Sequence, residues 1–438
     1  MENNILWGCI ADNFEGAAEA ASFFKKGGLE TVIYRGIPKT GINESFNAVV
    51  IDLETENLKS DKAVELSLSA IKYLKMIGTQ KFYYKYSSNF YRALKNNVGQ
   101  ISKALMDELG VKKTILCPAF PEKGYMVKMG IAYINGEPIS KNKEYSLNKN
   151  ESEIAELMAD ISPYPCINVD LEEMEEDNEE IWNRLNEFEK IMGAYYIVPD
   201  FVSEEDSYRI ADIFGSLDFL TGGAGIIEAL SERSGIKNNK FEGTDGKAII
   251  ISGSCSKSSL EQINKFIDNG GKAFKIDAIR LLYEKQTVGD LWNFMAENGD
   301  ETVLIYSSDT EENVKYNQRH GAKEISESLK NAAAELVETA VMNDYNRIII
   351  LGSETADAIT DKLGFDSYIT GCSAANGIPV IIPEKNKKLR LVIKSGDSGD
   401  ENFLQTAVKI TKKTKARHKS PAFYMLFPIT QKNISWTF

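Results

Sequence analysis

Histidine is nearly absent from this sequence: its 438 residues include only His320 and His418. This scarcity argues against a histidine-based metal site and against a catalytic triad that needs a histidine base. The five cysteines lie far apart and form no Cys-x-x-Cys pair. That spacing is typical of buried thiols in a reducing compartment and not of disulfides or a zinc site. We therefore predict no metal-ligating residues.

Excess positive charge and long apolar runs are also missing. The formal net charge of −13 disfavours binding to nucleic acid or to an anionic membrane, because the field of the protein repels phosphates. A nucleotide stays compatible with this charge, since backbone amides and a bound cation can hold its phosphates. No run of about 18 apolar residues occurs, and the first residues do not resemble a signal peptide. We therefore expect a cytoplasmic protein without membrane or nucleic-acid partners.

Two series of short apolar runs alternate with helical patterns along the chain. The first series lies at 5–11, 31–36, 48–53, 81–87 and 113–119, and the second lies at 248–256, 273–278, 301–308, 346–355 and 389–396. Buried strands that alternate with helices predict parallel sheets. The predicted fold class is α/β, with two α/β domains, mainly parallel sheets and an interdomain cleft. We expect an amino-terminal domain over 1–230, a linker over 231–247, a carboxyl-terminal domain over 248–415 and an irregular tail over 416–438.

Polar residues stand where several predicted strands of the first half end. Asp12, Asp52 and Lys85 lie at or just after such ends. Ligands of open α/β sheets gather at the carboxyl ends of the strands, so these residues are candidates for a ligand site. Farther along, Asn135-Gly136 is typical of a type I′ hairpin turn.

Glycine and serine follow three predicted strands of the second half, in "SGSCS", "GSET" and "KSG". Glycine lets backbone amides approach a phosphate, and the start of a following helix adds positive potential. Serine and threonine also cap helices for purely structural reasons, so one such turn has little weight. Three turns together favour a nucleotide or sugar-phosphate site, although neither a Walker A loop nor a GxGxxG fingerprint occurs.

The chain resembles the four-carbon acid sugar kinases over about residues 5–410. The resemblance is carried by nine segments in order: "GCIADNFEGA", "FYYKYSSNF", "NNVGQISKALMDELG", "ILCPAFPEKG", "YINGEPIS", "LTGGAG", "IIISGSCS", "LGSETADAI" and "LVIKSGDSG". It implies that the first domain binds an acid sugar and the second binds ATP. The implied ATP-binding residues are Ser252, Ser254, Ser256, Gly352, Ser353, Glu354, Thr355, Lys394, Ser395 and Gly396.

The implied substrate half departs from the family pattern. Of the family's Ala-Asp-Asp-x-Thr-Gly opening, this chain keeps the first aspartate as Asp12 but has Asn13 in place of the second. Where the family has an Arg-Thr pair, this chain has Tyr125-Met126. Other departures fall at 53–57, 90–93 and 141–150. The resemblance makes Asp12 and Asn13 the catalytic candidates, and the substrate-binding candidates are Lys85, Arg92 and Gly124.

The leading interpretation is an ATP-dependent kinase that uses Mg²⁺ and phosphorylates the terminal hydroxyl of a four-carbon sugar acid or a related polyhydroxy compound. The alternative is a catalytically lapsed relative that binds a nucleotide or metabolite without phosphoryl transfer, and the substituted residues favour it. A dehydrogenase-like protein is a third interpretation, which the missing glycine fingerprint opposes. A homodimer is expected from the general frequency of two-fold assemblies.

Overall fold

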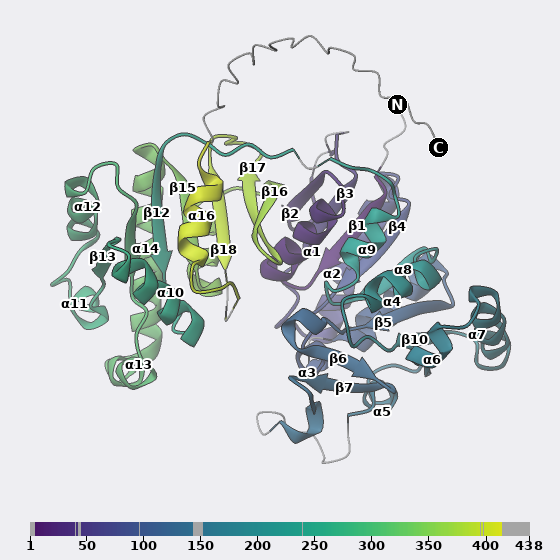
Figure 1. The fold of residues 1–438 in the computed structure, drawn as a ribbon. Helices are drawn as coiled ribbons and strands as arrows, with labels where there is room; N and C mark the ends of the chain where they lie inside the picture. The colour runs from purple at the N-terminus through teal and green to yellow at the C-terminus, as the bar shows by residue number, and fades with distance from the viewer. Residues whose placement is uncertain are drawn as a thin grey trace, which may run out of the picture.

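The computed structural model of the chain describes residues 5–39, 41–42, 45–95, 97–142, 152–238, 240–394, 396 and 398–413. Figure 1 shows two α/β halves, the amino-terminal half on the right and the carboxyl-terminal half on the left. Within the described residues, one fifteen-stranded sheet runs through both halves, and a three-stranded sheet lies beside the amino-terminal half.

The amino-terminal half places eight parallel strands in the order β2-β3-β1-β4-β11-β5-β10-β9. The five runs predicted as strands in this half form β1 to β5, so that prediction is confirmed. The bounds are β1 (Trp7–Ala11), β2 (Thr31–Arg35), β3 (Ala48–Asp52), β4 (Lys81–Lys85), β5 (Lys113–Cys117), β9 (Cys166–Val169), β10 (Tyr195–Pro199) and β11 (Phe219–Gly222).

Helices connect most of the successive strands of this half, as is usual for parallel pairing. α1 follows β1, and its small residues Ala17, Ala20 and Ala21 are fully buried, so the helix packs closely onto the sheet. The bounds are α1 (Phe14–Lys26), α2 (Ser60–Met76), α3 (Phe90–Lys95), α4 (Val98–Leu109), α5 (Ile154–Ala159), α6 (Leu171–Met174), α7 (Asn178–Met192), α8 (Asp206–Phe214) and α9 (Ile227–Glu232).

The small sheet consists of β6 (Tyr125–Lys128), β7 (Ile131–Ile134) and β8 (Glu137–Pro138), between the 3₁₀ turns η1 (Pro121–Lys123) and η2 (Ile139–Lys141). β7 and β8 pair as a hairpin in which Ile134 opposes Glu137. Asn135 and Gly136, which connect them, have φ of 50° and 82°. Positive φ at both central residues is the type I′ geometry, so the predicted hairpin turn is confirmed.

The carboxyl-terminal half continues the large sheet in the order β13-β14-β12-β15-β18-β17-β16. Five neighbouring strands, β13, β14, β12, β15 and β18, pair in parallel, whereas β17 and β16 run antiparallel to their neighbours. The strand bounds are β12 (Lys247–Ser252), β13 (Lys272–Lys275), β14 (Val303–Tyr306), β15 (Tyr345–Leu351), β16 (Ser367–Ala375), β17 (Ile378–Pro383) and β18 (Arg390–Lys394). The helices are α10 (Lys257–Asp268), α11 (Ala278–Leu282), α12 (Val288–Glu297), α13 (Glu311–Gln318), α14 (Ala322–Met342), α15 (Ser353–Leu363) and α16 (Phe403–Thr411).

The hairpin β16–β17 joins the two halves. β16 pairs antiparallel with β2, opposing Tyr368 to Ile33, and Figure 1 shows both strands of the hairpin beside α1. The hydroxyls of Ser22 on α1 and Ser373 on β16 lie 2.9 Å apart. The two halves are therefore fixed to each other by strand hydrogen bonds and by packing onto α1.

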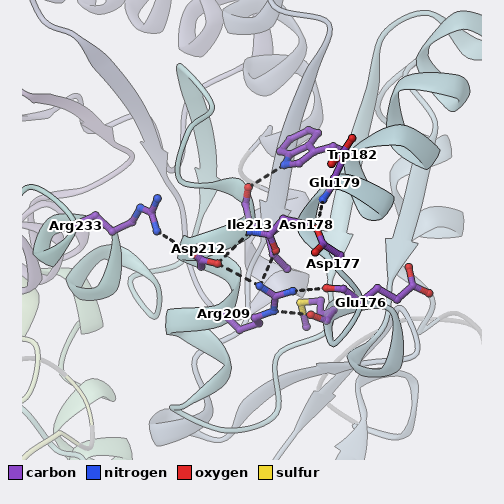
Figure 2. A network of polar contacts seen from close by, with 10 residues as sticks. Glu176, Asp177, Asn178, Glu179, Trp182, Arg209, Asp212, Ile213 and Arg233 are labelled. Atoms are coloured by element: carbon purple, nitrogen blue, oxygen red, sulfur yellow. Dashed lines mark hydrogen bonds and ion pairs between the residues drawn. The ribbon is translucent and has the colours of Figure 1, made fainter.

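A network of polar contacts ties the outer helices of the amino-terminal half together (Figure 2). The Arg209 guanidinium on α8 donates to Asn178 on α7 at 2.7 Å and to the carbonyl oxygens of Met174 and Glu176 at 2.5 and 2.8 Å. Asp212 then accepts from Arg233, which follows α9, at 3.0 Å. One arginine thus holds the α6–α7 connection against α8.

The predicted α/β fold class is confirmed. α9 extends to Glu232, so the first two residues of the expected linker are helical. The expected tail over 416–438 lies outside the described residues, and the interdomain cleft stays a prediction. Within the described part of the chain, no helix combines the length and apolar character that a membrane span requires.

Candidate functional site

The carboxyl ends of β2, β3, β1 and β4 form one edge of the sheet. Arg35 opposes Asp52, and Ala11 opposes both Asp52 and Lys85, so these residues end their strands at the same level. Asp12 follows directly after β1. The register therefore brings the predicted candidates Asp12 and Lys85 to one place, as their positions in the sequence indicated.

Asp12 is a buried carboxyl with 1% of its surface exposed. Its Oδ2 has no hydrogen-bond partner among the described residues. Burial is the largest influence on its pKa, and Glu56 adds to it while Lys85 opposes it; together they raise the pKa from 3.8 to about 7. A carboxyl with such a pKa can accept a proton near neutral pH.

Lys85 belongs to a cluster with Glu19 and Lys123. The Lys85 ammonium lies 3.1 Å from one Glu19 oxygen and donates to the Tyr86 carbonyl at 3.0 Å, and Lys123 pairs with the other Glu19 oxygen. Burial disfavours the Glu19 anion, but the two lysines outweigh burial and lower its pKa to about 2. Two cations thus flank one permanently ionised carboxylate. Lys123 is the accessible cation, with 33% of its side chain exposed against 3% for Lys85.

Asn13 caps α1. Its Oδ1 accepts from the Gly16 amide at 2.7 Å, as N-cap asparagines do. Its Nδ2 donates to Glu56 Oε2 at 2.8 Å. Both ends of the Asn13 amide are therefore occupied, and sequence reasoning did not anticipate Glu56 as its partner.

Asp52 and Arg35 lie on the side of the edge that meets the other half. Asp52 is fully buried, and burial raises its pKa to about 7. Arg35 binds Glu54 at 2.5 Å and reaches across to Asp361 on α15 at 2.6 Å. This ion pair connects the amino-terminal edge to the helix that begins with the "GSET" turn. The strand-end position, which made Asp52 a candidate in the sequence, was a signal that could have found Arg35 as well.

The remaining substrate candidates are Arg92 and Gly124, of which Gly124 directly follows Lys123. Arg92 is exposed on α3, where its amide donates to Asn89 at 3.3 Å. Gly124 has a φ of 78°, and a Cβ there would lie 2.1 Å from Asn135 Oδ1, so the turn before β6 requires glycine. Tyr125 and Met126 line a small, mostly apolar cavity with Phe90 and Pro118. Roles of Arg92 and Gly124 in substrate binding stay predictions.

The three glycine- and serine-rich turns of the second half meet at the ends of β12, β15 and β18. Ser256, which caps α10, lies 3.0 Å from the Gly396 carbonyl oxygen, and the Gly352 amide donates to the Lys394 carbonyl at 2.8 Å. Lys394 is buried and donates to Ser259 Oγ at 2.9 Å. Ser259 in turn donates to Ser254 at 2.9 Å. The turns therefore form one hydroxyl-rich surface around a lysine.

The backbone of these turns suits a phosphate. Gly352 has a φ of 112°, and a Cβ there would lie 3.1 Å from the Ser254 amide nitrogen. A Cβ on Gly253 would lie 2.2 Å from the hydroxyl of Thr355. Side chains at either position would fill the space above the amides and hydroxyls, so the glycines keep that space available for an anionic ligand.

The other predicted ATP-binding residues of the second half differ in how far they are exposed. The hydroxyl of Ser252 is buried against Ser308 at 2.7 Å, whereas Ser353 and Glu354 are exposed at the start of α15. Glu354 accepts from Ser326 on α14 at 3.3 Å. Ser395 lies outside the described residues.

Sequence reasoning missed the buried supports of the turns. Gln262 on α10 donates to the carbonyl oxygens of Ser398 and Gly399 at 3.1 and 3.2 Å and so holds the loop after β18. Ser259 was missed as well, although its place three residues after Ser256 is a capping signal. Among the described residues, no three His, Cys, Asp or Glu side chains gather as metal ligands.

Comparison with known proteins gives two family models, which together cover most of the chain. A sugar-binding N-terminal domain matches residues 7–230, and a nucleotide-binding C-terminal domain matches residues 249–404. The chain belongs to the four-carbon acid sugar kinase family. The family expected from the nine sequence segments is therefore confirmed.

Relatives within this family align over nearly their whole length. A 3-oxo-tetronate kinase of Pseudomonas fluorescens is 28% identical over 416 residues, which cover 92% of this chain and 96% of that protein. A 3-oxo-tetronate kinase of Haemophilus influenzae is also 28% identical, over 418 residues, with 92% and 99% covered. A solved structure of a Haemophilus influenzae protein is 27% identical, with a TM-score of 0.81 over 92% of this chain and all of that chain.

Proposed function

We propose that the chain is an ATP-dependent kinase that phosphorylates the terminal hydroxyl of a four-carbon sugar acid. The observation that carries this proposal is Asp12: a buried carboxyl with an unpartnered oxygen, a pKa of about 7 and a lysine cluster beside it. The related 3-oxo-tetronate kinases support the substrate class.

In the proposed reaction Asp12 accepts the proton of the substrate hydroxyl. The hydroxyl oxygen forms a bond to the γ-phosphorus of ATP as the bond to the β,γ-bridging oxygen breaks, which leaves ADP and the phosphorylated acid. Lys85 and Lys123 supply positive charge for the carboxylate of the substrate, because the two lysines share a single Glu19. Asn13 orients the site through the start of α1 and is not itself a base.

The turns of the second half are the proposed ATP site. The residues that would hold the phosphates are Ser254, Ser256, Gly352, Thr355 and Lys394. Mg²⁺ is commonly held by substrate phosphates and one or two carboxylates, so the absence of a three-ligand cluster among the described residues suits an ion that arrives with ATP. Bound with ATP, the ion would neutralise charge on the phosphates.

The test is ADP release from Mg-ATP with a panel of erythronates, threonates and their 3-oxo forms. We expect release that depends on one of these acids and that falls by about 10²- to 10⁴-fold in the Asp12→Asn variant. Stabilisation by Mg-ATP without turnover on any acid of the panel would contradict the proposal and favour a catalytically lapsed relative. The catalytic and binding roles named above fail with it.

A further inference from the structure

Glu56 is held against the end of β1 by two hydrogen bonds of its own and by a third from its loop. Its amide donates to the Asp12 carbonyl at 3.1 Å, and the nearby Leu53 amide donates to the Ala11 carbonyl at 3.1 Å. Its carboxylate accepts from the Asn13 amide at 2.8 Å. Because Asn13 Oδ1 is committed to the helix cap, its Nδ2 points in one fixed direction. The carboxylate of Glu56 is thus fixed beside the catalytic candidate.

Charges from three segments of the chain act around the Asp12 carboxyl. Lys85 on β4 favours its ionised form, whereas Glu56 in the loop after β3 and Glu19 on α1 disfavour it. Cys9 on β1 lies within reach of the same charges and stays a neutral thiol, since burial raises its pKa to about 12. Of the two carboxylates, Glu56 has the larger influence on Asp12. It therefore offsets part of the effect of Lys85.

Asn13 and Glu56 depend on each other. An aspartate at position 13 would cap α1 about as well as asparagine does. It would, however, place a second carboxylate 2.8 Å from Glu56 without a donor between them. The amide at position 13 thus donates to the Glu56 carboxylate in a way that an ionised aspartate could not.

We propose that Glu56, held by the Asn13 amide, is a positioning residue that supplies the second carboxylate beside Asp12 when Asp12 accepts the hydroxyl proton. This inference rests on the proposed kinase function. The departure at position 13 is then one of a pair: an amide stands at position 13, and the second carboxylate of the acceptor site is that of Glu56.

The test is the pH dependence of kcat/KM for the acid that the wild type prefers. Activity rises as Asp12 loses its proton, so the acidic limb reports on Asp12. We expect the apparent pKa of this acidic limb to be about one unit lower in Glu56→Gln and about one unit higher in Asn13→Asp. The double variant Asn13→Asp/Glu56→Gln restores one donor and one carboxylate, and its limb returns to that of the wild type. Glu56→Asp keeps the wild-type limb.

Glu54→Gln is the matched control, since it removes an equal charge from the same loop but from a residue that pairs with Arg35. Its limb is expected to stay in place. Equal limbs for Glu56→Gln, Glu54→Gln and the wild type would overturn the inference, and so would a double variant whose limb stays at that of either single variant.

A readout that does not need turnover separates this inference from the proposed function. Urea unfolding of Asp12→Asn is compared with its parent from pH 5 to pH 8, with and without Glu56→Gln. We expect the pH-dependent difference to shrink when Glu56 is changed, whether or not the wild type releases ADP. An unchanged difference would refute the role of Glu56 and leave the kinase proposal standing.

Discussion

Replacement of Asp12 by asparagine should make the protein more stable at alkaline pH. The pKa of Asp12 is raised from 3.8 to about 7 in the folded protein, mainly by burial. The folded chain therefore holds this proton more tightly than the unfolded chain does. The resulting stability is fully present below pH 3.8 and is lost as the pH rises through about 7. Asparagine cannot ionise, so the variant does not have this loss.

The size of the effect follows from the two pKa values. A pKa difference from 3.8 to about 7 corresponds to on the order of 4 kcal/mol, at about 1.4 kcal/mol per pH unit. Between pH 5 and pH 8 the wild type should lose about 2.5 kcal/mol relative to Asp12→Asn. Asp52, whose pKa is raised in the same way, is present in both proteins, and its contribution cancels.

Urea unfolding at several pH values measures this difference. The unfolding free energy of Asp12→Asn minus that of the wild type should increase steadily from pH 5 to pH 8, with equal m-values in both proteins. Asp52→Asn serves as a second variant with the same expected slope. A difference that stays constant over this range would show that Asp12 ionises normally, and the account of a buried base would be refuted.

Three further predictions concern other parts of the molecule. Lys123→Gln should raise the KM for the sugar acid about tenfold. Lys26→Gln, which removes an exposed lysine of α1, should leave this KM unchanged. An equal effect of both variants would contradict a contact between Lys123 and the substrate carboxylate. Lys394→Met should weaken ATP binding at least tenfold in calorimetric titration and leave binding of the acid unaltered. Arg209→Leu should lower the unfolding free energy by about 1–2 kcal/mol, because the carbonyl of the buried residue Met174 loses a charged donor, and a loss below about 0.5 kcal/mol would be inconsistent with the network in Figure 2.

Much of the fold was accessible from the sequence because parallel strands are continuous apolar runs that end in polar residues. β1 to β5 and the three glycine- and serine-rich turns were located in this way. The hairpin β16–β17 was not, although its turn at Asn376-Gly377 resembles the predicted turn at Asn135-Gly136. Its pairing with β2 joins segments more than 330 residues apart, and no local pattern specifies such a partner.

The site was only partly accessible for a similar reason. Asp12 and Lys85 follow from strand ends, since register alone brings them together. Glu19 and Lys123 meet only because one face of α1 packs against the turn after β5, and Glu56 reaches Asn13 through the conformation of a loop. Such contacts depend on tertiary packing, which residue types and spacing do not determine.

The most direct measurement of the central claim is single-turnover phosphoryl transfer from Mg-ATP to a four-carbon sugar acid, followed by mass spectrometry of the product. We expect one phosphate on the terminal hydroxyl, formed by the wild type and not by Asp12→Asn at pH 7. Phosphorylated acid formed equally well by both proteins would contradict the role of Asp12. No phosphorylated acid from any member of the panel would contradict the kinase itself.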